Sequence, residues 1–315
     1  MSNFKLILEY NGAGFSGSQI QNFKKSNAEI VDCEPSPRTV QGELEKALGI
    51  YFRSNISTNF SSRTDAGVHA IGQVVNFHLN QGVDGENAEI GVSLHAHLGD
   101  ENEVREPCHN SFSELVLSNP DKILIGLNGI LPDDMAVTKI EIVADDFDAR
   151  FSATAREYMY KIFIRKHRPV LRLDSLVWIK ESLDFNAMQV HAQKFLGEHD
   201  FSAYYRAESY AKNPVCHIVK SEMVQESGVC FKYYIRSNRF LKNMVRRIVG
   251  ELIQVGKLAA KGEDVSRLEP CFSVKNLALV IAADNDGCVA HGASSSLIKA
   301  KAEAPDGLTL MKVFY

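Results

Sequence analysis

One carboxylate in this chain sits where it could do chemistry. The stretch FSSRTDAGVHA at residues 60–70 places Asp65 between an arginine-threonine pair and two small residues. Arg63 and the threonine beside it can keep this carboxylate ionised, because nearby cations and hydrogen-bond donors stabilise the charged form. We expect the alanine and glycine that follow to leave open space for a ligand. The carboxylate could then act as a base, a metal ligand or a nucleophile, or simply cap a turn.

A metal site would combine Asp65 with His69 and His78. The spacing of four between the first two suits a helix, but a turn and then a strand are expected here. A hard cation also recruits more than one carboxylate, and no second acidic residue lies nearby in the sequence. The six cysteines include no C-x-x-C pair, and we expect them to be reduced thiols that bind no zinc. The residues favour a lone carboxylate that needs neither metal nor cofactor.

Composition limits the class of protein. The chain has 315 residues, of which 45% are hydrophobic and 23% charged, which is typical of a globular protein with a full core. A net charge of −4 argues weakly against nucleic-acid binding. Basic residues interleaved with aromatic ones at 165–172 and 236–247 nevertheless indicate a nucleic-acid groove. We find no apolar run that would span a membrane and no secretory or transit layout, so we expect an intracellular protein.

The elements that must position Asp65 are visible as periodic patterns. Alternating apolar residues predict strands at 4–10, 71–79, 157–166, 217–225 and 230–237, and another ending near Val143. Helical spacing predicts a helix capped by Thr39, a helix from Asp184 to a C-cap at Gly197, and a long helix over 239–256. The Asp65 turn thus lies just before a strand, on a loop held by rigid elements.

The order of these elements predicts an α+β fold of two ferredoxin-like (RRM-like) halves. We expect antiparallel sheets side by side, helices on one face and an active-site cleft between the halves. Residues 1–145 would form the half that carries the Asp65 loop, and residues 146–315 the half that carries the 239–256 helix. In that helix Arg246 adjoins the apolar stripe, and a buried arginine needs a carboxylate partner. The residues alone leave open whether that partner is Asp65.

Several segments together carry a family resemblance. SSRTDAGVHAIGQVVNF resembles the signature of the TruA family of tRNA pseudouridine synthases. Further blocks agree with that family in order along nearly the whole chain, namely TVQGELEKAL, LPDDMAV, DDFDARFSATAREYMYKI, FLGEHDFSAY and NRFLKNMVRRIVGELIQVG. Two positions depart from the family pattern, since Ser62 stands where glycine is common and Ser18 where many members carry tryptophan. The insertions at 23–38, 81–112 and 284–296 bear on which uridine is reached.

The resemblance implies roles for four residues. Asp65 matches the catalytic aspartate and Arg246 the arginine that pairs with it. Tyr158 matches the tyrosine that stacks on the target base and is a candidate acceptor of its C5 proton. Arg63 matches an arginine that holds the vacated place of the flipped nucleotide or its phosphate. The family needs no cofactor or metal and forms homodimers.

We therefore expect an isomerase that converts uridine to pseudouridine in the anticodon stem-loop of tRNA, at positions 38–40. We expect it in the cytoplasm, or in the nucleus or mitochondrion if its source is eukaryotic. Two alternatives stay open, namely a non-catalytic RNA-binding module of the same fold and a metal-dependent hydrolase around Asp65.

Overall fold

The computed structural model describes residues 2–20, 37–79, 119–170, 175–205, 213–270, 272 and 302–315. The predicted insertions at 81–112 and 284–296, and all but the last two residues of the one at 23–38, lie outside these ranges. Within them, no helix combines the length and the apolar character needed to cross a membrane.

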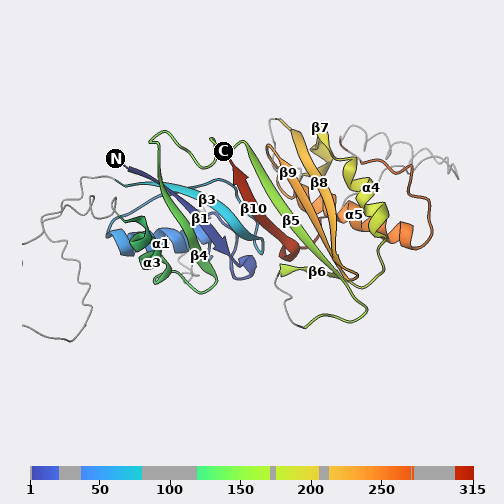
Figure 1. Cartoon of the computed structure of the whole chain (residues 1–315), viewed down its shortest axis with the longest axis horizontal. Helices are drawn as coiled ribbons and strands as arrows, with labels where there is room; N and C mark the ends of the chain where they lie inside the picture. The colour runs from blue at the N-terminus through green and yellow to red at the C-terminus, as the bar shows by residue number, and fades with distance from the viewer. Residues whose placement is uncertain are drawn as a thin grey trace, which may run out of the picture.

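The described strands form one large, mostly antiparallel sheet (Figure 1). Its strand order is β4-β1-β3-β10-β5-β9-β8-β7, with β2 paired to β3 and β6 to β5. The strands are β1 (Ser2–Tyr10), β2 (Thr58–Phe60), β3 (His69–Leu79), β4 (Met135–Val143), β5 (Ala155–Ile164), β6 (Val177–Ile179), β7 (Gly197–Asp200), β8 (Val215–Ser227), β9 (Cys230–Ser237) and β10 (Leu308–Phe314). The predicted α+β fold is confirmed, and the two expected sheets are joined into one.

Strand β10 makes this junction. Leu310 pairs with Ala70 of β3 in parallel and with Tyr158 of β5 in antiparallel fashion. The last strand of the chain therefore lies between the two halves and pairs with both, as Figure 1 shows. The division of the chain at residue 145 stays a prediction.

Helices pack at both ends of this sheet (Figure 1). They are α1 (Val40–Phe52), α3 (Pro120–Asn128), α4 (Phe185–Gln193) and α5 (Met244–Ala260). Two predicted caps are confirmed: the Thr39 hydroxyl accepts from the Gly42 N–H at 3.2 Å, and the Asp184 carboxylate accepts from the Ala187 N–H at 2.8 Å. Such caps satisfy N–H groups that have no partner within the first helical turn.

The ends of two helices differ from the prediction. Helix α5 begins at Met244 rather than at residue 239, because Asn243 adopts a left-handed conformation with a φ of 64°. Asparagine tolerates this conformation better than most residues do. A residue in the left-handed conformation cannot continue a right-handed helix. Helix α4 ends at Gln193, and Gly197, with a φ of 98°, begins β7 instead of capping the helix. Helix α3 is not among the helices that the sequence patterns predicted.

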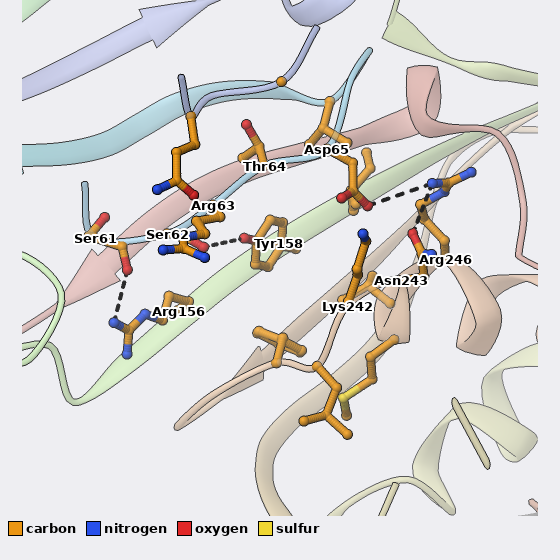
Figure 2. Close-up of a pocket in the computed structure, with 18 of the residues that line it drawn as sticks. Ser61, Ser62, Arg63, Thr64, Asp65, Arg156, Tyr158, Lys242, Asn243 and Arg246 are labelled. Carbon is orange, nitrogen blue, oxygen red and sulfur yellow. Dashed lines mark hydrogen bonds and ion pairs between the residues drawn. The ribbon is translucent and has the colours of Figure 1, made fainter. Parts of the chain in front are cut away.

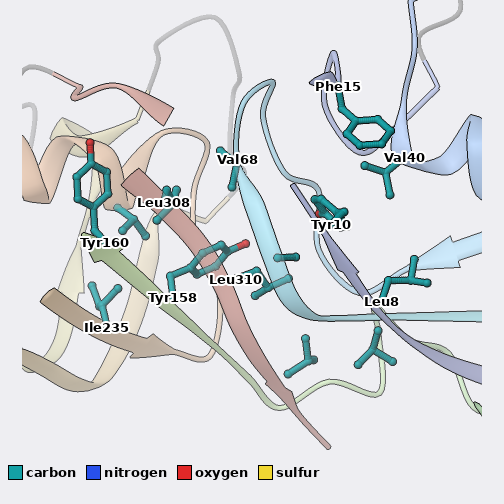
Figure 3. Packing of buried hydrophobic residues seen from close by; sticks show 14 of the residues in the cluster. Leu8, Tyr10, Phe15, Val40, Val68, Tyr158, Tyr160, Ile235, Leu308 and Leu310 are labelled. Atoms are coloured by element: carbon teal, nitrogen blue, oxygen red, sulfur yellow. The ribbon is translucent and has the colours of Figure 1, made fainter. Parts of the chain in front are cut away.

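Most of the core lies on one face of the sheet. Cross-strand partners share a face, and the series Tyr10, Ala70, Leu310, Tyr158 and Ile235 runs across both halves. Figure 3 labels four of these buried side chains, Tyr10, Leu310, Tyr158 and Ile235, and shows Val40 of α1 near Tyr10. At the other end of this face, a helix and a strand meet where the Ser221 hydroxyl donates to the Ala192 carbonyl of α4 at 2.6 Å.

Candidate active site

A pocket of about 880 Å³ opens between the two halves (Figure 2). The Asp65 turn lines it from the N-terminal half, and the residues at 239–246 line it from the C-terminal half. Tyr158 of β5 lies between these two segments. The structure therefore brings all four residues expected from the sequence, Arg63, Asp65, Tyr158 and Arg246, to one pocket.

Asp65 sits at the start of a tight turn. Its carbonyl oxygen accepts from the Val68 N–H at 3.2 Å, and Gly67 has a φ of 80°, which favours glycine at the third position of such a turn. The expected open space beside Gly67 is absent, because a Cβ there would lie 2.9 Å from Pro305 Cγ. The glycine thus permits close packing against the segment before β10, while the Asp65 side chain keeps 36% of its surface exposed.

The glycines of GAGFSG at 12–17 have the spacing of a dinucleotide-binding loop, but they do not form one. A 3₁₀ helix, Gly12–Gly14, follows β1 in place of the α-helix that such a loop opens. A Cβ on Gly12 would overlap the carbonyl oxygen of Val68. The Gly12 N–H donates to His69 Nδ1 at 3.0 Å. This segment therefore packs against Val68 and His69, at the end of the Asp65 turn.

Buried polar groups hold the turn on its N-terminal side. The Thr64 N–H donates to Ser18 Oγ at 2.9 Å, and the Thr64 hydroxyl lies 2.9 Å from the Tyr10 hydroxyl. Gln73, which is fully buried, donates to the Ser62 carbonyl at 2.7 Å. Because each of these buried groups has a partner, the network restricts the turn to one conformation.

Asp65 pairs with Arg246 across the pocket, with 3.7 Å between Asp65 Oδ2 and Arg246 Nη1 (Figure 2). Arg246 is itself fixed, because its Nε donates to the Glu303 carbonyl at 2.6 Å and its Nη1 to Asn243 Oδ1 at 3.1 Å. Asp65 is therefore the carboxylate partner of Arg246 that the residues alone left open, and this ion pair joins the two halves.

Tyr158 is almost fully buried, with 6% of its surface exposed. Its hydroxyl lies 2.7 Å from Ser62 Oγ, and its ring meets the ring of Phe240 edge-on at 5.2 Å. Burial raises the pKa of Tyr158, and the hydrogen bond with Ser62 only partly offsets this. The phenol is therefore protonated at neutral pH.

The pocket carries a strong positive charge. Among the described residues that line it, six are cationic and Asp65 alone is acidic. The cations are Arg63, Arg150, Arg156, Arg239, Lys242 and Arg246. This local excess explains how a chain with a net charge of −4 can attract a polyanion.

Sequence patterns missed two of these cations and misplaced two more. Arg239 and Lys242 belong to the predicted basic cluster at 236–247, but they lie in the loop before α5 and not on a helix face. No pattern pointed to Arg150 or Arg156. The other basic cluster supplies no described residue to the pocket.

The hypothesis of a metal site around Asp65 does not fit the geometry. His69 Nδ1 accepts from the Gly12 N–H, which leaves the ring proton on Nε2, 3.0 Å from the Asp306 carbonyl. Neither ring nitrogen then has a lone pair for a cation. Within the described ranges, no three potential ligands come together in a metal-binding group.

The fold and the pocket define an α+β protein with a cationic site, in which Asp65 is the one carboxylate that the described residues supply. Residues 191–289 match the family described as tRNA pseudouridine synthase. The chain is 36% identical to tRNA pseudouridine synthase A of Chlorobium limicola, over 85% of this chain and 90% of that protein. It is 34% identical to the protein of the same name from Dictyoglomus thermophilum, over 85% and 89% of the two chains. The chain belongs to the TruA family of tRNA pseudouridine synthases, which are isomerases.

Proposed function

We propose that this protein converts uridine to pseudouridine in tRNA, with Asp65 as the nucleophile. The observation that carries this proposal is the position of Asp65 in an ion pair with Arg246, where Asp65 is the one acidic residue beside six cations among the described residues that line the pocket. By family resemblance, the target uridines are those at positions 38–40 of the anticodon stem-loop.

The reaction rearranges bonds and needs no other reactant. The glycosidic bond between N1 and C1′ breaks, the uracil turns, and a bond forms between C5 and C1′. C5 loses a proton and N1 gains one, so the atoms balance. A carboxylate that attacks C1′, or alternatively C6 of the base, divides this change into two accessible steps. The residues support both points of attack.

The surrounding groups have separate tasks in this proposal. Arg246 orients Asp65, because the two side chains form an ion pair across the pocket. Tyr158 packs against the target base once it has left the stack. Its neutral phenol could accept the C5 proton only in a relay, in which the phenol passes its own proton to the Ser62 hydroxyl and Ser62 releases its proton to solvent. Arg63, which is exposed at the pocket, contacts the phosphate or the place that the base has left.

The assembly and location are also proposals. We propose a homodimer, which the family resemblance implies, and a location in the cytoplasm, since the relatives named above are bacterial. The halves at 1–145 and 146–315 would act as two lobes around the tRNA. Light scattering at several concentrations measures the oligomeric state directly, and a strictly monomeric protein would contradict the first of these statements.

The test uses an unmodified tRNA transcript and chemical detection of pseudouridine. We expect conversion by the native protein and a loss of at least about a thousandfold in Asp65→Asn and Asp65→Ala. Asp133→Asn, which removes an exposed carboxylate that does not line the pocket, is the matched control and should retain full activity. Full activity in Asp65→Asn would refute the assigned nucleophile. Sequencing of tRNA from cells that lack the protein identifies the position.

A non-catalytic RNA-binding module is the second candidate, because the cationic pocket would bind RNA without any chemistry. This alternative predicts salt-dependent binding of tRNA, no pseudouridine, and unchanged binding in Asp65→Ala. A single assay of the native protein for both binding and conversion separates the two candidates.

A further inference from the structure

Phe151 presents its aromatic ring to solvent at the rim of the pocket. The side chain is 83% exposed, although burial of a large apolar side chain usually stabilises the folded protein. It lines the pocket together with its neighbour Arg150, whose guanidinium carbon lies 5.8 Å from the centre of the ring. A ring that is held in water beside a cation needs an explanation.

The local backbone is rigid where this ring projects. Asp148 Oδ1 accepts from the N–H groups of both Arg150 and Phe151, each at 2.8 Å. The Ser152 N–H donates to the Asp148 carbonyl at 2.9 Å, and the Ser152 hydroxyl accepts from the Asp148 N–H at 3.1 Å. These bonds close a compact turn with Phe151 at its tip.

The same turn is also tied to the sheet. The Ala149 N–H donates to Asn76 of β3 at 2.9 Å, and the Ala149 carbonyl accepts from the Tyr315 hydroxyl at 2.8 Å. The Arg150 carbonyl accepts from Arg156 of β5 at 2.7 Å. The backbone is therefore fixed before any ligand arrives, and a preorganised group binds at a lower cost in conformational entropy.

Phe151 belongs to the end of the pocket that lies away from Asp65. Figure 2 shows Arg156 at one end, the Asp65–Arg246 pair at the other and Tyr158 between them. Arg150, which is hydrogen-bonded to Arg156, belongs to the first end. A volume of about 880 Å³ is near the top of the range of roughly 300–1,000 Å³ for small-molecule sites, so it has room beyond one nucleoside.

The aromatic ring of Phe151 and the guanidinium of Arg150, at this end of the pocket, are suited to bind a nucleobase and its phosphate. A base offers a flat π face that stacks on an aromatic ring whatever its sequence, and the adjacent phosphate suits an arginine. We propose that Phe151 and Arg150 form a platform on which a base next to the target uridine stacks, with its phosphate bound by Arg150. This inference rests on the proposed function for the identity of the ligand as tRNA. The platform holds the strand open while the target base occupies the site at Asp65.

The binding test uses the full-length protein and an unmodified tRNA transcript. We expect Phe151→Ala to weaken binding by about 5- to 100-fold, which is the usual effect of removing one stacked aromatic ring. Phe151→Trp should bind as well as the native protein, whereas Phe151→Leu, which is apolar but not aromatic, should resemble the alanine variant. Ile125→Ala, at a position on α3 that is 70% exposed and does not line the pocket, is the matched control.

A second arm tests the stacking partner. Transcripts that lack the base on the 5′ or the 3′ side of the target uridine are compared with the intact transcript. The loss caused by Phe151→Ala should disappear on one of these two abasic transcripts, because the partner is already absent there. Thermal unfolding of Phe151→Ala should match that of the native protein, since the ring packs against little else.

The outcomes separate the two proposals. Binding of the intact transcript by Phe151→Ala within twofold of the native protein overturns the platform, whether or not pseudouridine forms. If Phe151→Ala weakens the binding of both abasic transcripts as much as it weakens the binding of the intact transcript, the stacking of a neighbouring base is also overturned. A native protein that binds tRNA through Phe151 but forms no pseudouridine contradicts the proposed function and leaves the platform in place.

Discussion

The hydroxyl of Ser62 lies 2.7 Å from the phenolic oxygen of Tyr158, so the turn that carries Asp65 is tied directly to β5. The resemblance places glycine at position 62 in many family members, and glycine has no atom that could make this bond. Ser18, at the other unusual position, accepts from the Thr64 N–H at 2.9 Å. Both departures from the family pattern therefore add hydrogen bonds around the same turn.

We expect Ser62→Ala to lower kcat by about 2- to 10-fold with little change in KM, because one hydrogen bond contributes about 0.5–1.5 kcal/mol. Steady-state kinetics on a tRNA transcript measure this. Ser62→Thr, which keeps the hydroxyl, is the control. If the bond acts through Tyr158, the losses in Ser62→Ala and Tyr158→Phe will not add in the double variant; fully additive losses would contradict the coupling.

Replacement of Arg246 by lysine should remove most activity although the charge is kept. Arg246 uses Nε for the Glu303 carbonyl and Nη1 for both Asn243 and Asp65. A single ammonium cannot reproduce this fork. We expect kcat/KM to fall by about 10- to 100-fold in Arg246→Lys. Arg267→Lys, at an exposed position outside the pocket, should be unaffected, and equal activity of the two variants would show that charge alone suffices.

Glu251 should be essential for stability. It is fully buried, and its two oxygens bond to His191 Nε2 at 2.7 Å and to the Tyr204 hydroxyl at 2.6 Å. Glu251→Leu would remove one hydrogen bond from each of these two buried partners, which costs about 1–3 kcal/mol for each group. Urea unfolding measures the loss. Glu263→Leu, at an exposed glutamate, is the control, and a similar free energy of unfolding for both variants would refute the expectation.

The pair of Arg38 and Asp134 should make stability depend on pH. Two hydrogen bonds of 2.7 and 2.8 Å from Arg38 lower the pKa of Asp134 below its usual value. Because the pKa is lower in the folded state, this stabilisation is present above the unfolded-state pKa of about 3.9 and is lost as the pH falls through the folded-state value.

Asp134→Asn should therefore cost about 1 kcal/mol near pH 7, since both side chains are about one-third exposed and solvent screens the pair. The difference from the native protein should shrink as the pH falls below about 3.9 in a urea-unfolding series between pH 7 and pH 2. A difference that stays constant across this range would show that the pair contributes no pH dependence.

Local patterns predicted most of the elements because their causes are local. The Thr39 and Asp184 caps depend on residues three positions away, and strand alternation depends on every second residue. Errors appeared where one backbone angle decides the outcome, as at Asn243 and Gly197. The two cations in the loop before α5 were misplaced for this reason.

The sequence by itself determined the α+β class, the turn with its single carboxylate, and the family to which the chain belongs. Only the tertiary structure decided that β10 joins the halves and that Ser62 bonds to Tyr158, and it brings Arg246 to Asp65, a pairing that the family resemblance implied and the residues alone left open. These contacts join residues that are far apart along the chain. Their formation depends on how whole elements pack together, and no periodicity among neighbouring residues encodes that packing.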